Sequence, residues 1–425
     1  MMGIRSGTQL FPLAGLFTLT LALSSCSIGP RTPISVPSPD STEAKTPPSK
    51  DSSAKEDDFR LPEAQWVRED REIAAEVEPA QPSEEQATRV GHALVSIGAR
   101  PPWETEIPAS APAKAKVNKK PWRLQKTIWV GEGYLYQAAF TPDEKSVLTL
   151  STQSGELFHY ATSGKLLNKI PLNDFEEFED VEFAVLREAT DHPQVVITRE
   201  SATSILDLQS GNSDPLSSSP SGTGVQHSGR QGLYGISDRH TEPQSGSLIL
   251  QWVTGELAAI FKCDERPDDW ALSADGKTIA LQYYPSNKTQ VIDLLHRRLL
   301  LEVASPRWGG SVALSPDGAL MALGGESLRL VSLANGKVLA EDTSYKNNIN
   351  DVRFTANGDT LLVSAYDGKA RSYSLPADLS SLTQLPSPQL LSHSGSANVY
   401  ALGLSKDGNS LVTSSGDKTL KIWVR

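Results

Sequence analysis

The residue types that most often carry out chemistry are scattered through this chain of 425 residues. No two histidines have a metal-binding spacing such as HxxxH, and no HExxH motif is present. The chain also lacks a GxSxG nucleophile elbow, a P-loop and a GxGxxG motif that leads into a helix. The histidines are His92, His159, His192, His227, His240, His296 and His393. These patterns predict no catalytic residue, no metal and no cofactor.

The two cysteines have different surroundings. Cys263 ends a short apolar run that begins at Ala258, which is typical of a small core residue rather than a reactive thiol. Cys26 follows an uncharged apolar stretch, Leu10–Leu23. As a helix, these fourteen residues would span about 21 Å, which is too short for the ~30 Å hydrocarbon core of a membrane. A secretory signal peptide is the better interpretation.

The end of this stretch, Leu23-Ser24-Ser25-Cys26, resembles the lipobox of bacterial lipoproteins. The resemblance implies a signal peptide over residues 1–25 and acyl chains, palmitate among them, on Cys26. It also implies a protein anchored in the cell envelope. Ser27 follows the cysteine where an aspartate would stand in proteins retained at the inner membrane, so the resemblance favours the periplasmic side of the outer membrane. The alternative is an ordinary secretory signal that happens to contain a cysteine.

Three segments are expected between the cysteine and the regular part of the chain. Residues 26–60 are rich in Pro, Ser, Thr, Asp and Lys, which predicts a disordered, flexible tether. Residues 61–98 predict a short helical segment, and residues 99–121 a Pro/Ala/Lys linker. Two short helices are expected in this segment, the first over Glu63–Glu78. The second is indicated by a capping box at Ser83–Gln86 and a stripe of apolar residues: Val90, Ala93, Leu94 and Ile97. These helices could pack on the following domain or on another protein.

A short phrase recurs over the rest of the chain: an apolar residue, Ser or Thr, any residue, Asp or Asn, then Gly. Asp or Asn bonds the backbone ahead of it, and Gly supplies the positive φ of a tight β-turn. Strand-like runs flank each copy, and the last three intervals are 42, 40 and 50 residues. The copies are Leu272–Gly276, Leu314–Gly318, Phe354–Gly358, Leu404–Gly408 and the incomplete Phe140–Glu144. This period, with four short strands per unit, predicts a β-propeller.

Residues 393–424 resemble the consensus of the WD40 repeat, with Asp417-Lys-Thr-Leu-Lys-Ile-Trp423 as their most specific part. The preceding repeat matches less well, since it has Asp367-Gly and then Tyr373 in place of the tryptophan. The resemblance implies an all-β, seven-bladed WD40-type propeller over residues 122–425. It also implies that residues 123–130 close the ring as the fourth strand of the last blade. The structural tetrad that it implies consists of His393, Thr413 or Ser415, Asp417 and Trp423.

The same resemblance locates a binding face, since residues at the start of each inner strand lie around one mouth of the channel. The positions six and four residues before the apolar residue of a turn phrase give these candidates: Tyr134, Tyr136, Arg266, Trp308, Asn348, Asn350, Asn398 and Tyr400. Tyr, Trp and Arg are enriched among residues that dominate protein interfaces. Some of these rings could instead fill space between blades.

The net charge of −11 argues against nucleic acid, because phosphate binding usually needs a basic face. We therefore expect a membrane-anchored, monomeric scaffold in the bacterial cell envelope that binds an unknown protein or peptide without catalysis. The alternative is a periplasmic propeller enzyme, similar to a lactonase or lyase, with a metal in its central channel.

Overall fold

The chain divides into two units by its internal contacts, Met1–Glu72 and Ile73–Arg425. All residues that the computed structural model describes belong to the second unit. They are residues 87–104, 120–131, 133–151, 154–172, 182–185, 193–199, 202–215, 224–227, 233–238, 246–252, 256–308, 310–379 and 382–425. The expected signal peptide, Cys26, the tether and residues 61–86 lie outside these ranges. Within them, no helix has the length and apolar character needed to cross a bilayer.

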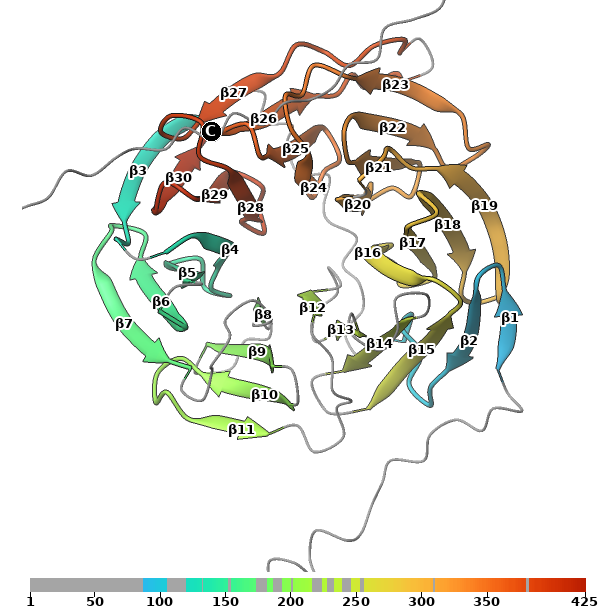
Figure 1. The fold of residues 1–425 in the computed structure, drawn as a ribbon, viewed down its shortest axis with the longest axis horizontal. Helices are drawn as coiled ribbons and strands as arrows, with labels where there is room; N and C mark the ends of the chain where they lie inside the picture. Colours follow the sequence, from blue (N-terminus) through green and yellow to red (C-terminus); the bar gives the residue numbers. More distant parts are fainter. Residues whose placement is uncertain are drawn as a thin grey trace, which may run out of the picture. The chain divides into compact units, whose positions relative to one another are not determined.

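Seven antiparallel sheets lie around a ring, so the fold is an all-β, seven-bladed β-propeller (Figure 1). Blade 1 contains β4 (Leu135–Phe140), β5 (Ser146–Ser151), β6 (Glu156–Ala161) and β7 (Leu166–Pro171). Blade 2 contains β8 (Glu182–Val185), β9 (Gln194–Arg199), β10 (Ala202–Asp207) and β11 (Ser213–Pro215). Blade 3 contains β12 (Gly224–His227), β13 (Leu233–Asp238), β14 (Gly246–Trp252) and β15 (Leu257–Cys263).

Blade 4 contains β16 (Arg266–Leu272), β17 (Thr278–Tyr284), β18 (Lys288–Asp293) and β19 (Arg298–Ala304). Blade 5 contains β20 (Ser311–Leu314), β21 (Leu320–Gly324), β22 (Leu328–Ser332) and β23 (Val338–Asp342). Blade 6 contains β24 (Ile349–Phe354), β25 (Thr360–Ala365), β26 (Lys369–Ser374) and β27 (Gln389–Ser392). Blade 7 contains β28 (Val399–Leu404), β29 (Ser410–Ser415), β30 (Thr419–Val424) and β3 (Arg123–Trp129).

The ring is closed by a strand from the beginning of the propeller, as the sequence predicts. β3 pairs antiparallel with β30, from Arg123 opposite Val424 to Trp129 opposite Thr419. The outer edge of β30 is therefore covered by β3. Blade 7 is thus built from both ends of the propeller sequence. Covering this edge removes a row of unpaired backbone groups that would otherwise be open to other strands.

The recurring phrase forms the turn between the first and second strands of its blades. In blade 4, Ser273 Oγ donates a hydrogen bond to Asp275 Oδ1 over 2.6 Å, and Asp275 accepts from the Lys277 backbone at 3.1 Å. Gly276 has a φ of 72°. Glu144 holds the corresponding position in blade 1 with a φ of 59°, although it is not a glycine. We call the end of the propeller with these turns the lower face, and the end where the chain enters each inner strand the upper face.

Neighbouring inner strands are joined by a hydrogen bond that recurs in the same register. A side-chain acceptor three residues before the apolar residue of the turn phrase binds a backbone N–H of the next inner strand. The four pairs seen are Gln137–Phe183, Asp269–Val312, Ser311–Val352 and Asp351–Leu402. Ala401 stands at this position in blade 7, so the junction between blades 7 and 1 lacks this side-chain acceptor.

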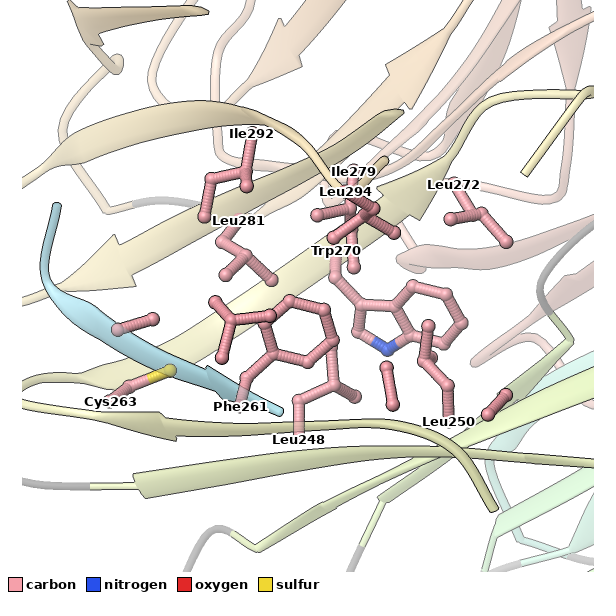
Figure 2. Close-up of a cluster of buried hydrophobic side chains, with 14 of the residues drawn as sticks. Leu248, Leu250, Phe261, Cys263, Trp270, Leu272, Ile279, Leu281, Ile292 and Leu294 are labelled. Carbon is pink, nitrogen blue, oxygen red and sulfur yellow. The ribbon is translucent and has the colours of Figure 1, made fainter. Parts of the chain in front are cut away.

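Apolar side chains fill the spaces between blades. The cluster between blades 3 and 4 is built around Phe261 and Trp270, which lie among leucines from both sheets (Figure 2). Gly235 allows the indole to approach, since a Cβ there would lie 2.2 Å from a ring atom of Trp270. Cys263 lies in the same cluster, and burial raises the pKa of its thiol to about 12. The thiol is thus a core group, as the sequence predicts.

The prediction of a helical segment over residues 61–98 is wrong for its described part, residues 87–98. Residues 88–97 form a hairpin of β1 (Thr88–Val90) and β2 (Ala93–Ile97), and β2 pairs with β15 to extend blade 3 to six strands. Gly91 has a φ of 57°, which suits the first position of a two-residue hairpin turn. Val90, Ala93 and Val95 are buried, which is one face of a hairpin. Over so few residues, apolar spacing fits a helix and a hairpin equally well.

The described start of the expected linker is also part of the propeller. The Trp252 indole N–H donates to the Arg100 carbonyl oxygen at 2.8 Å, and the Arg100 guanidinium lies over the same indole ring. Trp103 packs against the cluster between blades 3 and 4. The folded body therefore includes residues 87–104, and does not begin at residue 122 as the sequence predicts.

Candidate functional site

The residues proposed for the binding face differ in how far they reach solvent. Trp308 is 62 % exposed, Tyr134 53 % and Tyr136 44 %. Each precedes or begins an inner strand: Tyr134 and Tyr136 belong to blade 1, and Trp308 to the loop that enters blade 5. Tyr400 is only 6 % exposed, so its predicted place on an open surface is wrong.

Tyr400 is the centre of a group of aromatic rings that we call the tyrosine cluster: Tyr134, Tyr136, Tyr366 and Tyr400. The ring centroid of Tyr400 lies 4.3 Å from that of Tyr136, 5.5 Å from that of Tyr366 and 6.3 Å from that of Tyr134. The cluster brings together blades 1, 6 and 7 at the upper face. It therefore lies beside the junction where Ala401 leaves the inter-blade hydrogen bond unmade.

Tyr366 was missed by the sequence reasoning because it does not precede an inner strand. It lies between β25 and β26, directly before Asp367-Gly368. The signal that could have found it is this turn, which also ends at the upper face. Counting residues before the inner strands alone leaves out half of the loops on that face.

The asparagines predicted for the face support the tyrosine cluster. The Tyr366 hydroxyl donates to Asn350 Oδ1 at 2.7 Å, and Asn350 Nδ2 donates to the Tyr400 carbonyl oxygen. Asn398 Nδ2 lies 3.4 Å from the Tyr400 hydroxyl. Burial raises the pKa of both Tyr366 and Tyr400, so these phenols stay protonated at neutral pH. Asn350 and Asn398 thus help to hold the rings in position.

The other two polar residues of the predicted face have local partners. Arg266 opens β16, and its Nη2 lies 3.7 Å from Asp268 Oδ1. The Asn348 carbonyl oxygen accepts from the backbone of Tyr366 at 2.9 Å, which ties the entry of blade 6 to the loop that carries Tyr366. Both side chains are half-buried.

Trp308 stands apart from the tyrosine cluster, and its backbone is unusual. Its φ is 59°, a conformation that bulky L-residues avoid at a cost of about 1–2 kcal/mol. Neighbouring glycines hold the loop close to blades 5 and 6. A Cβ at Gly310 would lie 2.0 Å from the Ile349 carbonyl oxygen, and one at Gly325 would lie 2.6 Å from that of Arg307. The indole is therefore presented to solvent on a constrained backbone.

The histidine of the predicted tetrad lies in a buried hydrogen-bonded chain. His393 Nε2 is 2.7 Å from Thr413 Oγ1, which also accepts from the Trp423 indole N–H at 3.0 Å. His393 Nδ1 is 3.2 Å from Asp417 Oδ1. Of the two candidates on β29, Thr413 makes these bonds, whereas Ser415 Oγ accepts from the Asp417 backbone at 3.1 Å. Burial lowers the pKa of His393, against the opposing effect of Asp417.

Blade 6 contains a different buried network that the sequence did not reveal. Tyr373 replaces the tryptophan of blade 7, and its hydroxyl donates to Asp342 Oδ2 at 2.7 Å and lies 2.8 Å from the Tyr345 hydroxyl. The guanidinium of Arg371 lies 4.2 Å from the centre of the Tyr345 ring and forms a buried ion pair with Asp367. Tyr345, Arg371 and Tyr373 are buried, so this network packs the blade.

Among the described residues, no three His, Cys, Asp or Glu side chains come together as a metal site would require. His159 and His393 are both buried in single blades, where their partners are Ser146 and the tetrad. Both histidines therefore take part in folding contacts, and the upper-face residues described above offer aromatic contact and hydrogen bonding.

The comparisons with known proteins agree with this fold. Residues 386–424 match the family described as WD domain, G-beta repeat, and this range runs from just before β27 to the end of β30. No curated protein matches the chain. The protein is an all-β, seven-bladed β-propeller that contains a WD40 repeat. Propellers of this class are typically scaffolds that bind proteins and are usually not catalytic.

Proposed function

We propose that this protein is a lipid-anchored scaffold of the bacterial cell envelope whose upper face binds a protein or peptide partner. The propeller with its WD40 repeat supports a role in protein binding. The lipobox-like Leu23–Cys26 supports the anchor, since two or three acyl chains hold a protein stably on a membrane. The serine at position 27 supports the outer membrane, on its periplasmic side.

The observation that carries the proposal is Trp308. A largely exposed indole adds little to the folding free energy, while its left-handed backbone reduces stability. The protein thus holds an aromatic ring in a fixed, strained and solvent-facing position. Aromatic side chains bury much area for little loss of entropy and often dominate interfaces. Partner binding would explain why a tryptophan occupies this position instead of a glycine.

The test replaces Trp308 by Gly, which removes the ring and relieves the backbone. We expect Trp308→Gly to raise stability by up to about 1 kcal/mol and to weaken partner binding by about 2 kcal/mol or more. Stability would be read by denaturant unfolding, and binding by affinity capture from detergent-solubilised membranes with quantification of each captured protein. Trp129→Ala is the matched control, because Trp129 is equally exposed but lies on the outer strand β3.

Two outcomes would contradict the upper-face assignment. One is unfolding of the Trp308→Gly variant, which would make the indole a structural group. The other is capture that falls equally in the Trp129→Ala control. A photo-crosslinking residue at position 134 should form an adduct with the same partner, whereas one at Leu167, on the outer strand of blade 1, should not.

The anchor has a separate test. Cys26→Ser should leave an uncleaved precursor and abolish labelling by a fatty-acid analogue, because the thiol that accepts the lipid is gone. Labelling that persists in this variant would refute the lipoprotein assignment, and the upper-face proposal would be unaffected.

A further inference from the structure

A cavity of about 310 Å³ opens on the lower face between blades 6 and 7, far from the upper-face residues. Its wall includes Trp122, which precedes the closing strand β3, Thr360 and Ser372 of blade 6, and Arg425 after β30. The volume lies at the lower end of the range of small-molecule sites. Because β3 completes blade 7, both ends of the propeller sequence contribute to this cavity.

Three charged residues line the wall, Lys120, Asp359 and Arg425, and the side chain of Arg425 is 4 % exposed. Nε donates to the Gly408 carbonyl oxygen at 2.9 Å, and Nη1 donates to Thr360 Oγ1 at 2.9 Å. The guanidinium also lies over the Trp122 ring, 4.8 Å from its centre. These contacts fix the guanidinium beside the cavity.

The nearest carboxylate does not make a direct hydrogen bond to Arg425. Asp359 Oδ1 lies 3.8 Å from Arg425 Nη2, and the carboxylate instead accepts from Thr355 and Thr360 on one oxygen and from Asn357 on the other. A guanidinium has five N–H donors, and the described residues take up two of them in hydrogen bonds. Burial lowers the pKa of Arg425, against the opposing effects of Asp359 and Asp407.

The remaining wall combines polar side chains, which are held in place by hydrogen bonds, with the apolar Pro121 and Leu375. Ser372 Oγ accepts from the Trp122 indole N–H at 3.0 Å, and Gln389 forms hydrogen bonds with both the backbone N–H and the carbonyl oxygen of Trp122. Ser387 and Thr360 add hydroxyls to the lining. Hydroxyls both donate and accept, so they suit a ligand that itself carries several hydroxyl groups.

We infer that this cavity binds a small hydroxylated anion, such as a sugar acid or a sugar phosphate, with its anionic group on Arg425. The planar guanidinium fork matches the two oxygens of a carboxylate or phosphate. The serine and threonine hydroxyls would hold the polyol part. This site is independent of the proposed protein-binding face.

The experiment measures binding to the full chain by ligand-observed NMR and by calorimetry. The probes are gluconate and glucose 6-phosphate, with glucose as the uncharged counterpart and acetate and inorganic phosphate as bare anions. We expect gluconate, glucose 6-phosphate or both to bind at least tenfold more tightly than glucose and than the matching bare anion. The preference between the two probes shows whether the natural ligand carries a carboxylate or a phosphate.

Two variants test whether the ligand binds in this cavity. Arg425→Gln should weaken binding at least tenfold, and Ser387→Phe should block the cavity while the exposed loop keeps its fold. Arg298→Gln, which removes an exposed arginine on blade 4, should leave binding unchanged. The inference is overturned if no probe binds at 10 mM, if glucose binds as tightly as the anions, or if Ser387→Phe retains full affinity. Should Arg425→Gln fail to fold, Ser387→Phe decides alone.

Discussion

Blades 6 and 7 are neighbours with similar strands, yet their buried polar networks are built from different residues. Tyr373 pairs opposite Leu361 as Trp423 pairs opposite Leu411, so the two rings occupy equivalent positions. Blade 7 links its ring through a threonine hydroxyl to a histidine and an aspartate. Blade 6 has Val363 where blade 7 has Thr413, and it uses phenols and an arginine.

In these two blades, different sets of residues complete a buried polar network at the same place. In each blade the network joins the strand that carries the ring to the loop that enters the blade. The two networks differ in their charged groups, however. Blade 6 contains a buried ion pair, whereas blade 7 contains a histidine that is neutral when buried. The two blades should therefore respond differently to mutation and to pH.

The largest effect is expected from removing the strand that blade 7 borrows from the start of the propeller. A chain that begins at residue 131 lacks β3 and leaves β30 unpaired, so we expect a loss of several kcal/mol from a typical total of ~5–15 kcal/mol. A chain that begins at residue 118 keeps β3 and serves as the control. Thermal unfolding compares them, and equal melting temperatures would contradict the role of β3.

The next effect comes from breaking the ion pair of blade 6. Asp367→Asn leaves the buried guanidinium of Arg371 without its carboxylate partner, which should cost about 3–5 kcal/mol. The double variant Asp367→Asn with Arg371→Met should recover part of this loss, because no buried charge then remains. Urea unfolding measures both. A single variant that is as stable as the wild type would show that the pair is dispensable.

A smaller effect is expected from the central hydroxyl of blade 7. Thr413→Val keeps the shape of the side chain but leaves the Trp423 N–H and His393 Nε2 without their common partner, at a cost of about 1–3 kcal/mol. Thr413→Ser retains the hydroxyl and is the control. The valine variant should be clearly less stable than the serine variant; the reverse order would mean that packing of the methyl group dominates.

The smallest effect is a difference in pH dependence between the two blades. Burial lowers the pKa of His393, so the unfolded chain binds a proton near pH 6.5 that the folded blade takes up only at lower pH. The contribution of His393 to folding stability is therefore fully present above about pH 6.5, and it is lost as the pH falls toward the pKa of the folded state. In blade 6, burial raises the pKa of Tyr345 and Tyr373, so neither phenol titrates between pH 5 and 8.

We therefore expect His393→Asn to lower stability at pH 7.5 and to reduce the further loss between pH 7.5 and 5.5. Part of that loss should remain, because burial also lowers the pKa of His159. An unaltered profile in His393→Asn would show that this histidine does not contribute to acid sensitivity.

The sequence could predict the ring because its information is local and repeated. Each turn phrase has a fixed order of residue types and recurs at a regular period, which predicts a propeller. The seven blades and the borrowed closing strand are what the resemblance to the WD40 repeat implies. The hairpin at residues 88–97 could not be predicted in the same way. It is short, it occurs once, and its strand β2 is stabilised by pairing with β15, far away in the sequence.

The candidate site was predicted in part. The register correctly places Tyr134, Tyr136 and Trp308 at positions exposed to solvent, because these positions follow from the start of each inner strand. Register does not determine how deeply a side chain is buried, so Tyr400 was expected too near the surface. The network of blade 6 was hidden because Tyr345, Arg371 and Asp342 match no recurring phrase.

The hairpin of β1 and β2 has a mechanical consequence if Cys26 anchors the protein as proposed. Any pull between the membrane and a bound partner would reach the described part of the propeller first at β1, the outermost strand of blade 3. Such a load would peel β1 from β2 one residue pair at a time before it reached the ring. The hairpin would then act as a release that lengthens under tension while the blades, and the face that holds the partner, stay intact.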